Sequence, residues 1–262
     1  MTYDRCPKCA HAPLPVNQSA PAACPACGVI LAKVTAIGMA KIAARDAPLV
    51  ADLETEPRTG LFEVFFHVPQ ALDRMYWALR TVAFVSVTLW TIWILQSVDI
   101  AAGEAGSFFL WAVLTPFHEA GHVLLMWAPQ FVTILGGTLG QWLMPAGLAG
   151  MLLIQRRDPF GAALFTWLLG YSFIMTAVYM FDAFDPKIML LDGRTGAESD
   201  GHDWQNMFGD LGLLPRARGI GSFFGWLGQA LMLAAIAWAA AIVWLQRARV
   251  SDNPFAEDGV DG

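Results

Sequence analysis

The residues best able to do chemistry lie in one short stretch, FHEAGH, which runs from Phe117 to His122. Residues four apart on a helix share a face, so His118 and His122 can each offer a ring nitrogen to one metal ion. Glu119 follows the first histidine, where its carboxylate could take a proton from a water molecule beside the metal. Zinc makes such a water more acidic and polarises a carbonyl group. The stretch therefore predicts a zinc hydrolase, with a chance match or a non-catalytic metal site as alternatives.

A catalytic zinc ion needs a third protein ligand. The polar stretch LLDGRTGAESDGHDWQNM contains His202 and Asp203, and we expect the third ligand to be one of these two. Asp182 and Asp192 are the competing candidates. Asn206 lies one turn after His202 in an expected short helix, so its amide could donate a hydrogen bond to an oxyanion. The alternative for this stretch is a capped surface helix with solvated acidic side chains.

The cysteines form a second candidate metal site. All four lie within the first 27 residues, as the pairs Cys6 with Cys9 and Cys24 with Cys27. Each C-P-x-C stretch places two thiolates on a tight turn, and four sulfurs suit a structural zinc ion. We expect a small zinc ribbon over residues 1–30 whose folding depends on the metal, and a redox-active dithiol pair is the alternative. Since no cysteine is left for an extracytoplasmic disulfide, the pattern also favours a reducing compartment.

The rest of the chain has the composition of a membrane protein. Of the 262 residues, 56% are apolar, and the few charged residues fall in clumps that leave long apolar runs. We expect an all-α polytopic membrane protein with about four to six transmembrane helices. Ionisable residues at membrane depth are costly and usually functional, which supports the interpretation of FHEAGH. The runs long enough to cross a bilayer are 81–98, 105–128, 123–155, 160–181 and 220–245.

The elements around these runs complete the expected organisation. Residues 31–75 form a linker and an interfacial segment, residues 76–246 the transmembrane domain, and residues 247–262 a disordered acidic tail. The net charge of −6 gives no reason to expect nucleic acid as a partner. If each run crosses the bilayer once, the ribbon and the tail lie on opposite sides. The distribution of Lys and Arg then favours the cytosol for the ribbon.

Over roughly residues 105–205, the sequence resembles the site-2 protease family of intramembrane zinc metalloproteases. HEAGH inside an apolar run carries the resemblance, together with the stretch FVTILGGTLGQW that follows it. In that family the motif helix is followed by a membrane-associated β-hairpin with a Gly-Gly pair. The resemblance implies such a hairpin over residues 131–139, containing Gly136 and Gly137, which would receive an unwound substrate by strand addition.

The third element of the family matches only in part. Its third zinc ligand is the Asp of a Leu-Asp-Gly stretch, and Leu191-Asp192-Gly193 is the corresponding stretch here. No Asn precedes Pro186, and polar residues follow Asp192 where the family has a membrane helix. We therefore keep His202 and Asp203 as the expected source of the ligand.

The resemblance implies a zinc-dependent endopeptidase that cleaves membrane-anchored proteins within the bilayer, with residues 76–246 as its metalloprotease-like domain. One zinc ion would be catalytic and one structural, and the ribbon would bind a cytosolic protein partner. We expect the chain in a bacterial inner membrane. The main alternative is a non-proteolytic membrane adaptor that uses the ribbon to recruit its partner. A metal transporter ranks last, because the apolar runs lack further ligands.

Overall fold

The computed structural model describes residues 3–6, 8–19, 22–31 and 60–251. The chain divides into two compact units, residues 1–59 and 60–262. Most of the predicted linker, residues 32–59, and most of the predicted acidic tail, residues 252–262, lie outside the described residues.

The N-terminal unit is built on two tight turns, each of which carries one cysteine pair. The Ala10 N–H donates to the Cys6 carbonyl, and the Gly28 N–H donates to the Cys24 carbonyl, both closing a turn. A single antiparallel bridge joins Ala23 to Ile30. The small core of this unit contains Cys6, Cys24 and Leu31, so the cysteines themselves are part of what the unit buries.

The second unit is helical, which confirms the predicted fold class at this level. Four of its helices are long and apolar enough to cross a membrane: α3, α5, α6 and the segment Leu214–Arg249 that contains α8. Helix α4 has 17 residues and is not among them. The helices are α2 (Leu61–Phe65), α3 (Arg74–Ser97), α4 (Phe108–Leu124), α5 (Gln130–Ile154), α6 (Pro159–Asp182), α7 (Asp203–Asp210) and α8 (Ala217–Gln246), with the 3-10 turns η2 (Leu214–Arg216) and η3 (Arg247–Arg249).

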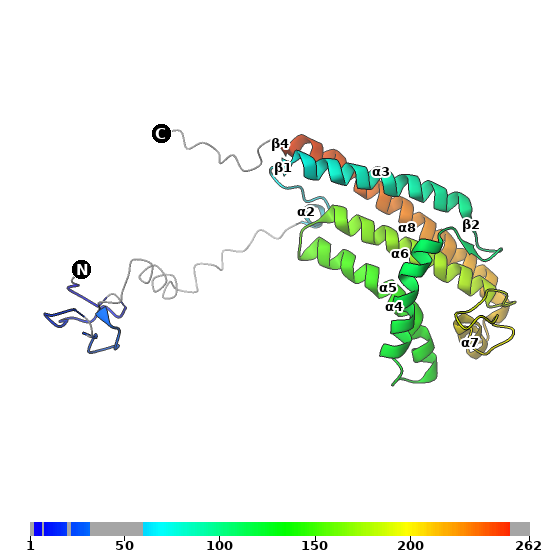
Figure 1. Cartoon of the computed structure of the whole chain (residues 1–262), viewed down its shortest axis with the longest axis horizontal. Helices are drawn as coiled ribbons and strands as arrows, with labels where there is room; N and C mark the ends of the chain where they lie inside the picture. The colour runs from blue at the N-terminus through cyan, green and yellow to red at the C-terminus, as the bar shows by residue number, and fades with distance from the viewer. Residues whose placement is uncertain (1–2, 7, 20–21, 32–59, 252–262) are drawn as a thin grey trace. The chain divides into compact units, whose positions relative to one another are not determined.

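Helix α6 lies at the centre of the unit. It crosses α8 at a pair of glycines, where a Cβ on Gly170 would lie 2.8 Å from the Gly228 carbonyl oxygen and a Cβ on Gly228 would lie 2.6 Å from that of Gly170. The Trp167 indole donates to the Thr91 hydroxyl at 2.7 Å, which ties α6 to α3. Helices α3, α6 and α8 run alongside one another, and α4 crosses them (Figure 1).

The β-hairpin predicted over residues 131–139 is wrong, because these residues belong to α5. The glycines in this stretch let two helices touch rather than break one. A Cβ on Gly121 of α4 would overlap the Gly136 carbonyl oxygen, and a Cβ on Gly140 would overlap the Phe117 carbonyl oxygen. A helix satisfies its own backbone hydrogen bonds, which a membrane does not supply, so this solution also suits an apolar surrounding.

Two short strand pairs close the ends of the helical unit. Strand β1 (Leu72–Asp73) pairs in parallel with β4 (Val250–Ser251), and β2 (Val98–Asp99) pairs with β3 (Glu104–Ala105) in an antiparallel hairpin. The Trp77 indole also donates to the Val243 carbonyl at 3.1 Å. The chain therefore enters α3 and leaves α8 at one end of the bundle.

Because β4 pairs with β1, residues 247–251 at the start of the predicted tail lie at the same end of the helical unit as the start of α3, whereas five crossings would put them at opposite ends. Five crossings require five spans, whereas four helices qualify as candidate spans in the part of the chain that the structure describes. The distribution of basic residues between the two ends also differs from the expected one. Arg80 of α3 forms an ion pair with Asp158 before α6, at 2.8 Å, so Arg156 and Arg157 lie at the same end as Arg74, Arg247 and Arg249.

Candidate metal centre

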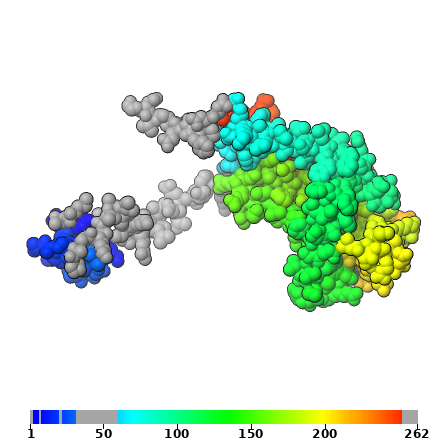
Figure 2. Space-filling model, in the orientation of Figure 1, coloured from blue at the N-terminus to red at the C-terminus, as the bar shows by residue number. Residues whose placement is uncertain are grey.

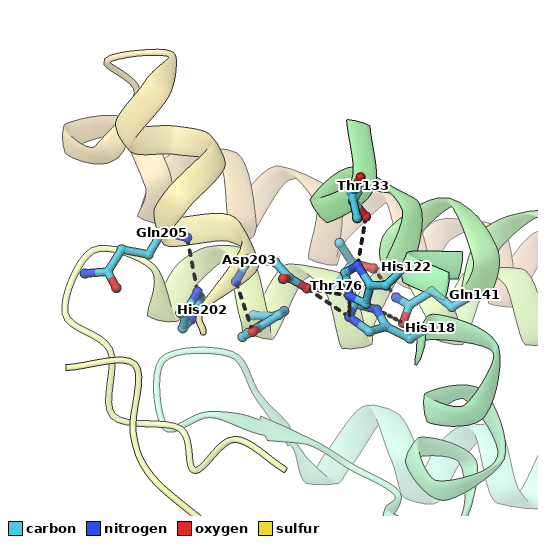
Figure 3. A network of polar contacts seen from close by, with 9 residues as sticks. His118, His122, Thr133, Gln141, Thr176, His202, Asp203 and Gln205 are labelled. Carbon is cyan, nitrogen blue, oxygen red and sulfur yellow. Dashed lines mark hydrogen bonds and ion pairs between the residues drawn. The ribbon is translucent and has the colours of Figure 1, made fainter. Parts of the chain in front are cut away.

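Three side chains from two distant parts of the helical unit meet at one point. The Nε2 atoms of His118 and His122 lie 3.1 Å apart, and the Asp203 Oδ2 atom lies 2.9 Å from the first and 3.2 Å from the second. A tetrahedral zinc ion needs neighbouring N and O ligand atoms about 3.3 Å apart, close to the sides of this triangle. Figure 3 shows Asp203 pointing toward the two histidines from the segment that includes α7, and in Figure 2 this yellow segment lies against the green helices α4 and α5.

The far nitrogen of His118 fixes the protonation of its ring. Its Nδ1 atom lies 3.2 Å from the Gln141 Oε1 atom, and the other end of that amide donates to the Thr176 hydroxyl at 2.6 Å. The Thr176 hydroxyl cannot donate in return, because it donates to the Ser172 carbonyl at 2.9 Å. The amide oxygen therefore faces His118, so Nδ1 must carry the proton and a neutral ring leaves a lone pair on Nε2.

His122 is oriented in the same way by a backbone group. Its Nδ1 atom lies 2.9 Å from the Thr133 carbonyl oxygen, which can only accept a hydrogen bond. Nδ1 therefore carries the proton, and Nε2 presents a lone pair toward His118 and Asp203. Two such lone pairs and a carboxylate oxygen repel one another unless a proton or a metal cation lies between them. The donor set thus fits a divalent metal bound by two imidazoles and one carboxylate.

Asp203 owes its position to the start of α7 and to one contact with α6. It is the first residue of the helix, and its backbone N–H donates to the Tyr179 hydroxyl at 3.2 Å. Burial raises the pKa of the Asp203 carboxyl, but the contacts with His118 and His122 outweigh burial and hold this pKa below its ordinary value. The carboxylate is therefore available as a ligand at neutral pH.

The structure places His202, the other predicted ligand, outside the metal group. Its ring is fully buried, with 0% exposure; the Nδ1 atom accepts the Gln205 N–H at 3.1 Å, and Nε2 lies 3.2 Å from Asp182 Oδ2. Both nitrogens are occupied, so His202 caps α7 instead of binding the metal. Figure 3 shows it turned toward Gln205, away from the other two histidines.

The remaining candidates are also engaged elsewhere. The Asn206 amide donates to the Asp200 carbonyl at 2.7 Å, and Asn206 does not line the cavity beside the ligands, so it is not placed for the predicted oxyanion contact. Asp182 accepts the backbone N–H groups of Lys187 and Ile188 in addition to its contact with His202. Asp192 pairs with Arg194 at 2.7 Å. Neither of these two carboxylates belongs to the ligand group.

Gly137 of α5 lies directly beside the ligand nitrogens. A Cβ at this position would overlap His122 Nε2 and lie 2.7 Å from His118 Nε2. Any side chain here would therefore enter the space where the three ligand atoms meet. The Gly-Gly pair thus has two roles: Gly136 lets α4 approach, and Gly137 leaves space beside the candidate ligand nitrogens.

The three ligands border a cavity of about 660 Å³, which lies within the range of small-ligand pockets. Glu119 lines the same cavity, as do Tyr179 and Trp204. A site with three protein ligands and an adjoining cavity leaves a metal coordination position for water or substrate, which is typical of catalytic zinc.

The four cysteines make a different kind of site. Their Sγ atoms all lie within 4.8 Å of one another, with Cys6 to Cys27 at 3.6 Å and Cys9 to Cys24 at 3.7 Å. Tetrahedral zinc with four thiolates requires sulfur atoms about 3.8 Å apart. Burial raises the pKa of Cys6, but backbone N–H groups of Lys8 and Cys9 and the neighbouring thiols bring it to about 7. The four sulfurs thus lie close enough to bind one metal ion and close its coordination sphere.

Sequence reasoning missed the residues that orient the ligands. Gln141 and Thr176 are polar residues inside long apolar helices, and that was a usable signal, because polar groups at such depth are costly unless they have a role. The Thr133 contact is made by a backbone carbonyl, so the type of residue at position 133 could not have revealed it.

Comparison with protein-family models, with curated proteins and with solved structures found no match for this chain.

Proposed function

We propose that this chain is a zinc-dependent endopeptidase that cleaves membrane-anchored proteins. The observation that carries the proposal is the ligand triangle of His118, His122 and Asp203, with Glu119 in the same cavity. When bound, a zinc ion would polarise the scissile carbonyl and make the attacking water more acidic.

The other steps of the proposed reaction are assigned to residues of the chain. Glu119 accepts a proton from the attacking water and then donates it to the amine that leaves. Gln141 and the Thr133 carbonyl hold the two imidazoles so that their Nε2 atoms face the metal. Asp203 would balance part of the charge of a bound ion.

The contrast between the two metal sites supports a catalytic role for the histidine site. Four thiolates occupy every position of a tetrahedral ion, which suits a structural metal, whereas two imidazoles and one carboxylate leave a position open beside the cavity. Membrane substrates are supported by the elements that form the site. Gln141 and Thr176 lie on α5 and α6, and both helices are long and apolar enough to cross a membrane.

The proposal retains the resemblance to site-2 proteases, carried by HEAGH, but without the substrate-binding hairpin. It retains a structural zinc ion in the ribbon, a cytosolic protein partner for the ribbon, and a bacterial inner membrane as the location.

The first test is zinc per chain in detergent-purified protein, for the wild type and for His122→Ala. We expect two zinc ions in the wild type and one in the variant, with the ribbon ion retained. Equal zinc in both proteins would contradict a metal centre at His122.

The second test measures cleavage of a single-span model substrate in proteoliposomes. Glu119→Gln keeps the shape of the side chain but removes the base, so we expect cleavage to fall at least about 100-fold while both zinc ions remain bound. A non-proteolytic adaptor predicts a different pair of results: no cleavage by the wild type, and no effect of Glu119→Gln on recruitment of a partner.

A further inference from the structure

Asn206 points to the Asp200 carbonyl and does not line the cavity, which leaves the proposed reaction without its expected oxyanion donor. We propose that the Tyr179 hydroxyl takes this role and donates a hydrogen bond to the substrate carbonyl oxygen as it becomes negatively charged. This inference rests on the proposed function, because it concerns the same cavity and the same reaction.

The hydroxyl of Tyr179 is held beside the candidate metal ligands, and its O–H group is not used in another hydrogen bond of the described residues. Tyr179 lines the cavity, and its oxygen accepts the backbone N–H of Asp203, the residue whose carboxylate completes the triangle. Among the hydrogen bonds of the described residues, none has this hydroxyl as the donor. The contact with Asp203 therefore fixes the oxygen, and the proton remains available to a group bound in the cavity.

The ring of Tyr179 is fixed from two sides. It packs on the His202 ring with the centroids 4.1 Å apart, and it meets the His118 ring edge-on at 6.4 Å. A donor that does not need to reorganise stabilises a developing charge more effectively than a mobile one. The buried His202 thus contributes to the cavity by holding Tyr179 as well as by capping α7.

Two other donors near the cavity suit the role less well. Trp204 and Thr138 both line it, but their Nε1 and Oγ1 atoms are buried and have no hydrogen-bond partner. A substrate oxygen could reach either atom only after a side chain moved. Tyr179 is only partly buried, and its hydroxyl is already anchored.

The step balances with water as the only co-reactant. The water oxygen forms a bond to the carbonyl carbon, the π electron pair moves to the carbonyl oxygen, and Glu119 takes one water proton. Tyr179 keeps its own proton and only donates a hydrogen bond to the oxyanion. When the C–N bond breaks, the nitrogen takes the proton from Glu119, which leaves a carboxylic acid and an amine.

The test compares Tyr179→Phe with the wild type, using two peptide inhibitors that bind zinc in different ways. A peptide phosphonamidate carries a charged oxygen in place of the oxyanion, whereas the matching peptide thiol binds through one sulfur and has no such oxygen. We expect phosphonamidate affinity to fall about 10- to 100-fold and thiol affinity to stay unchanged. With substrate, kcat should fall about 100-fold and KM should change little.

Two controls keep the result interpretable. Tyr76→Phe, which removes a hydroxyl that contacts Arg80 outside the cavity, should leave both affinities and kcat unchanged. Zinc content must stay at two ions in Tyr179→Phe. The inference is overturned if this variant binds the phosphonamidate as tightly as the wild type, or loses affinity for both inhibitors equally.

Failure of the proposed function looks different from failure of this inference. A wild-type protein that holds two zinc ions but binds neither inhibitor and cleaves nothing would overturn both. A wild-type protein that cleaves and depends on Glu119, together with an unimpaired Tyr179→Phe, would overturn only the role of Tyr179.

Discussion

Each histidine of the candidate metal centre is oriented by a hydrogen bond at its Nδ1 atom, the ring nitrogen that faces away from the ligand triangle. Gln141 can hold His118 only because Thr176 and Ser172 fix the direction of the Gln141 amide. Removing contacts of this kind from metal sites typically costs about 10- to 100-fold in affinity. The same reasoning applies to the third ligand, whose position depends on the helix that begins with it.

His202 offers the sharpest test at this scale. His202→Ala removes the cap of α7 and leaves Asp182 without its ring partner, so we expect zinc affinity at the histidine site to fall about 10- to 100-fold. His202→Asn can restore the cap and should recover part of the loss. Chelator competition measures the affinity, and the ribbon ion is the internal reference.

The control for this prediction is His67→Ala, a histidine outside the metal group, which should leave zinc affinity unchanged. Complete loss of the second zinc ion in both His202 variants would instead indicate that His202 is a ligand.

At the scale of elements, the close contact between α4 and α5 is what opens the metal position. Gly121, Gly136 and Gly140 let the two helices approach, and the approach carries Gly137 against the histidine nitrogens. The glycines of this stretch suggest a turn in the sequence, but in the structure they form a close contact between two helices.

We therefore expect Gly137→Ala to abolish zinc binding at the histidine site, because the new Cβ would overlap His122 Nε2. Gly147→Ala, on the same helix with nothing within 4 Å of the added Cβ, is the matched control and should keep the ion. Zinc per chain and a thermal unfolding curve measure both variants. A Gly137→Ala protein with two zinc ions would mean that α5 lies farther from α4 than described here.

Spacing along the chain predicted the local part of the site and left the distant ligand open between two neighbouring residues. His118 and His122 are one helical turn apart, so their shared direction follows from spacing alone. Asp203 lies 85 residues from His118, and only the fold distinguishes it from His202 next to it. The glycines of α5 were ambiguous in principle, since the same residues permit a tight turn or a close helix contact, and only the opposing Gly121 decides between them.

At the scale of the whole helical unit, the pairing of β1 with β4 brings the two ends of the unit together. Six arginines lie at this end, namely Arg74, Arg80, Arg156, Arg157, Arg247 and Arg249, whereas Lys187, Arg194, Arg216 and Arg218 follow α6 or precede the long part of α8 at the other end. On this excess of basic residues we propose the cytosolic side for the end with β1 and β4.

This arrangement predicts the sidedness of inserted protease sites. A site at Gly60 and one after Gly262 should be cut from the same side of sealed membrane vesicles, and a site at Gly193 only from the other side. Immunoblots of inside-out and right-side-out vesicles measure the cleavage. If the sites at Gly60 and after Gly262 were cut from opposite sides, the chain would cross the membrane an odd number of times, as five spans would.

The same strand pairing has a consequence for synthesis on the ribosome. Helix α3 is the first candidate span to emerge, yet Val250 and Ser251, which pair with the strand before it, are made after every helix. The metal ligands, from His118 to Asp203, all precede α8. A nascent chain therefore contains all three ligand residues before α8 is made and the bundle can close. If synthesis stopped before α8, the face of α6 around Gly170 would stay uncovered and would be accessible to the quality-control machinery of the membrane.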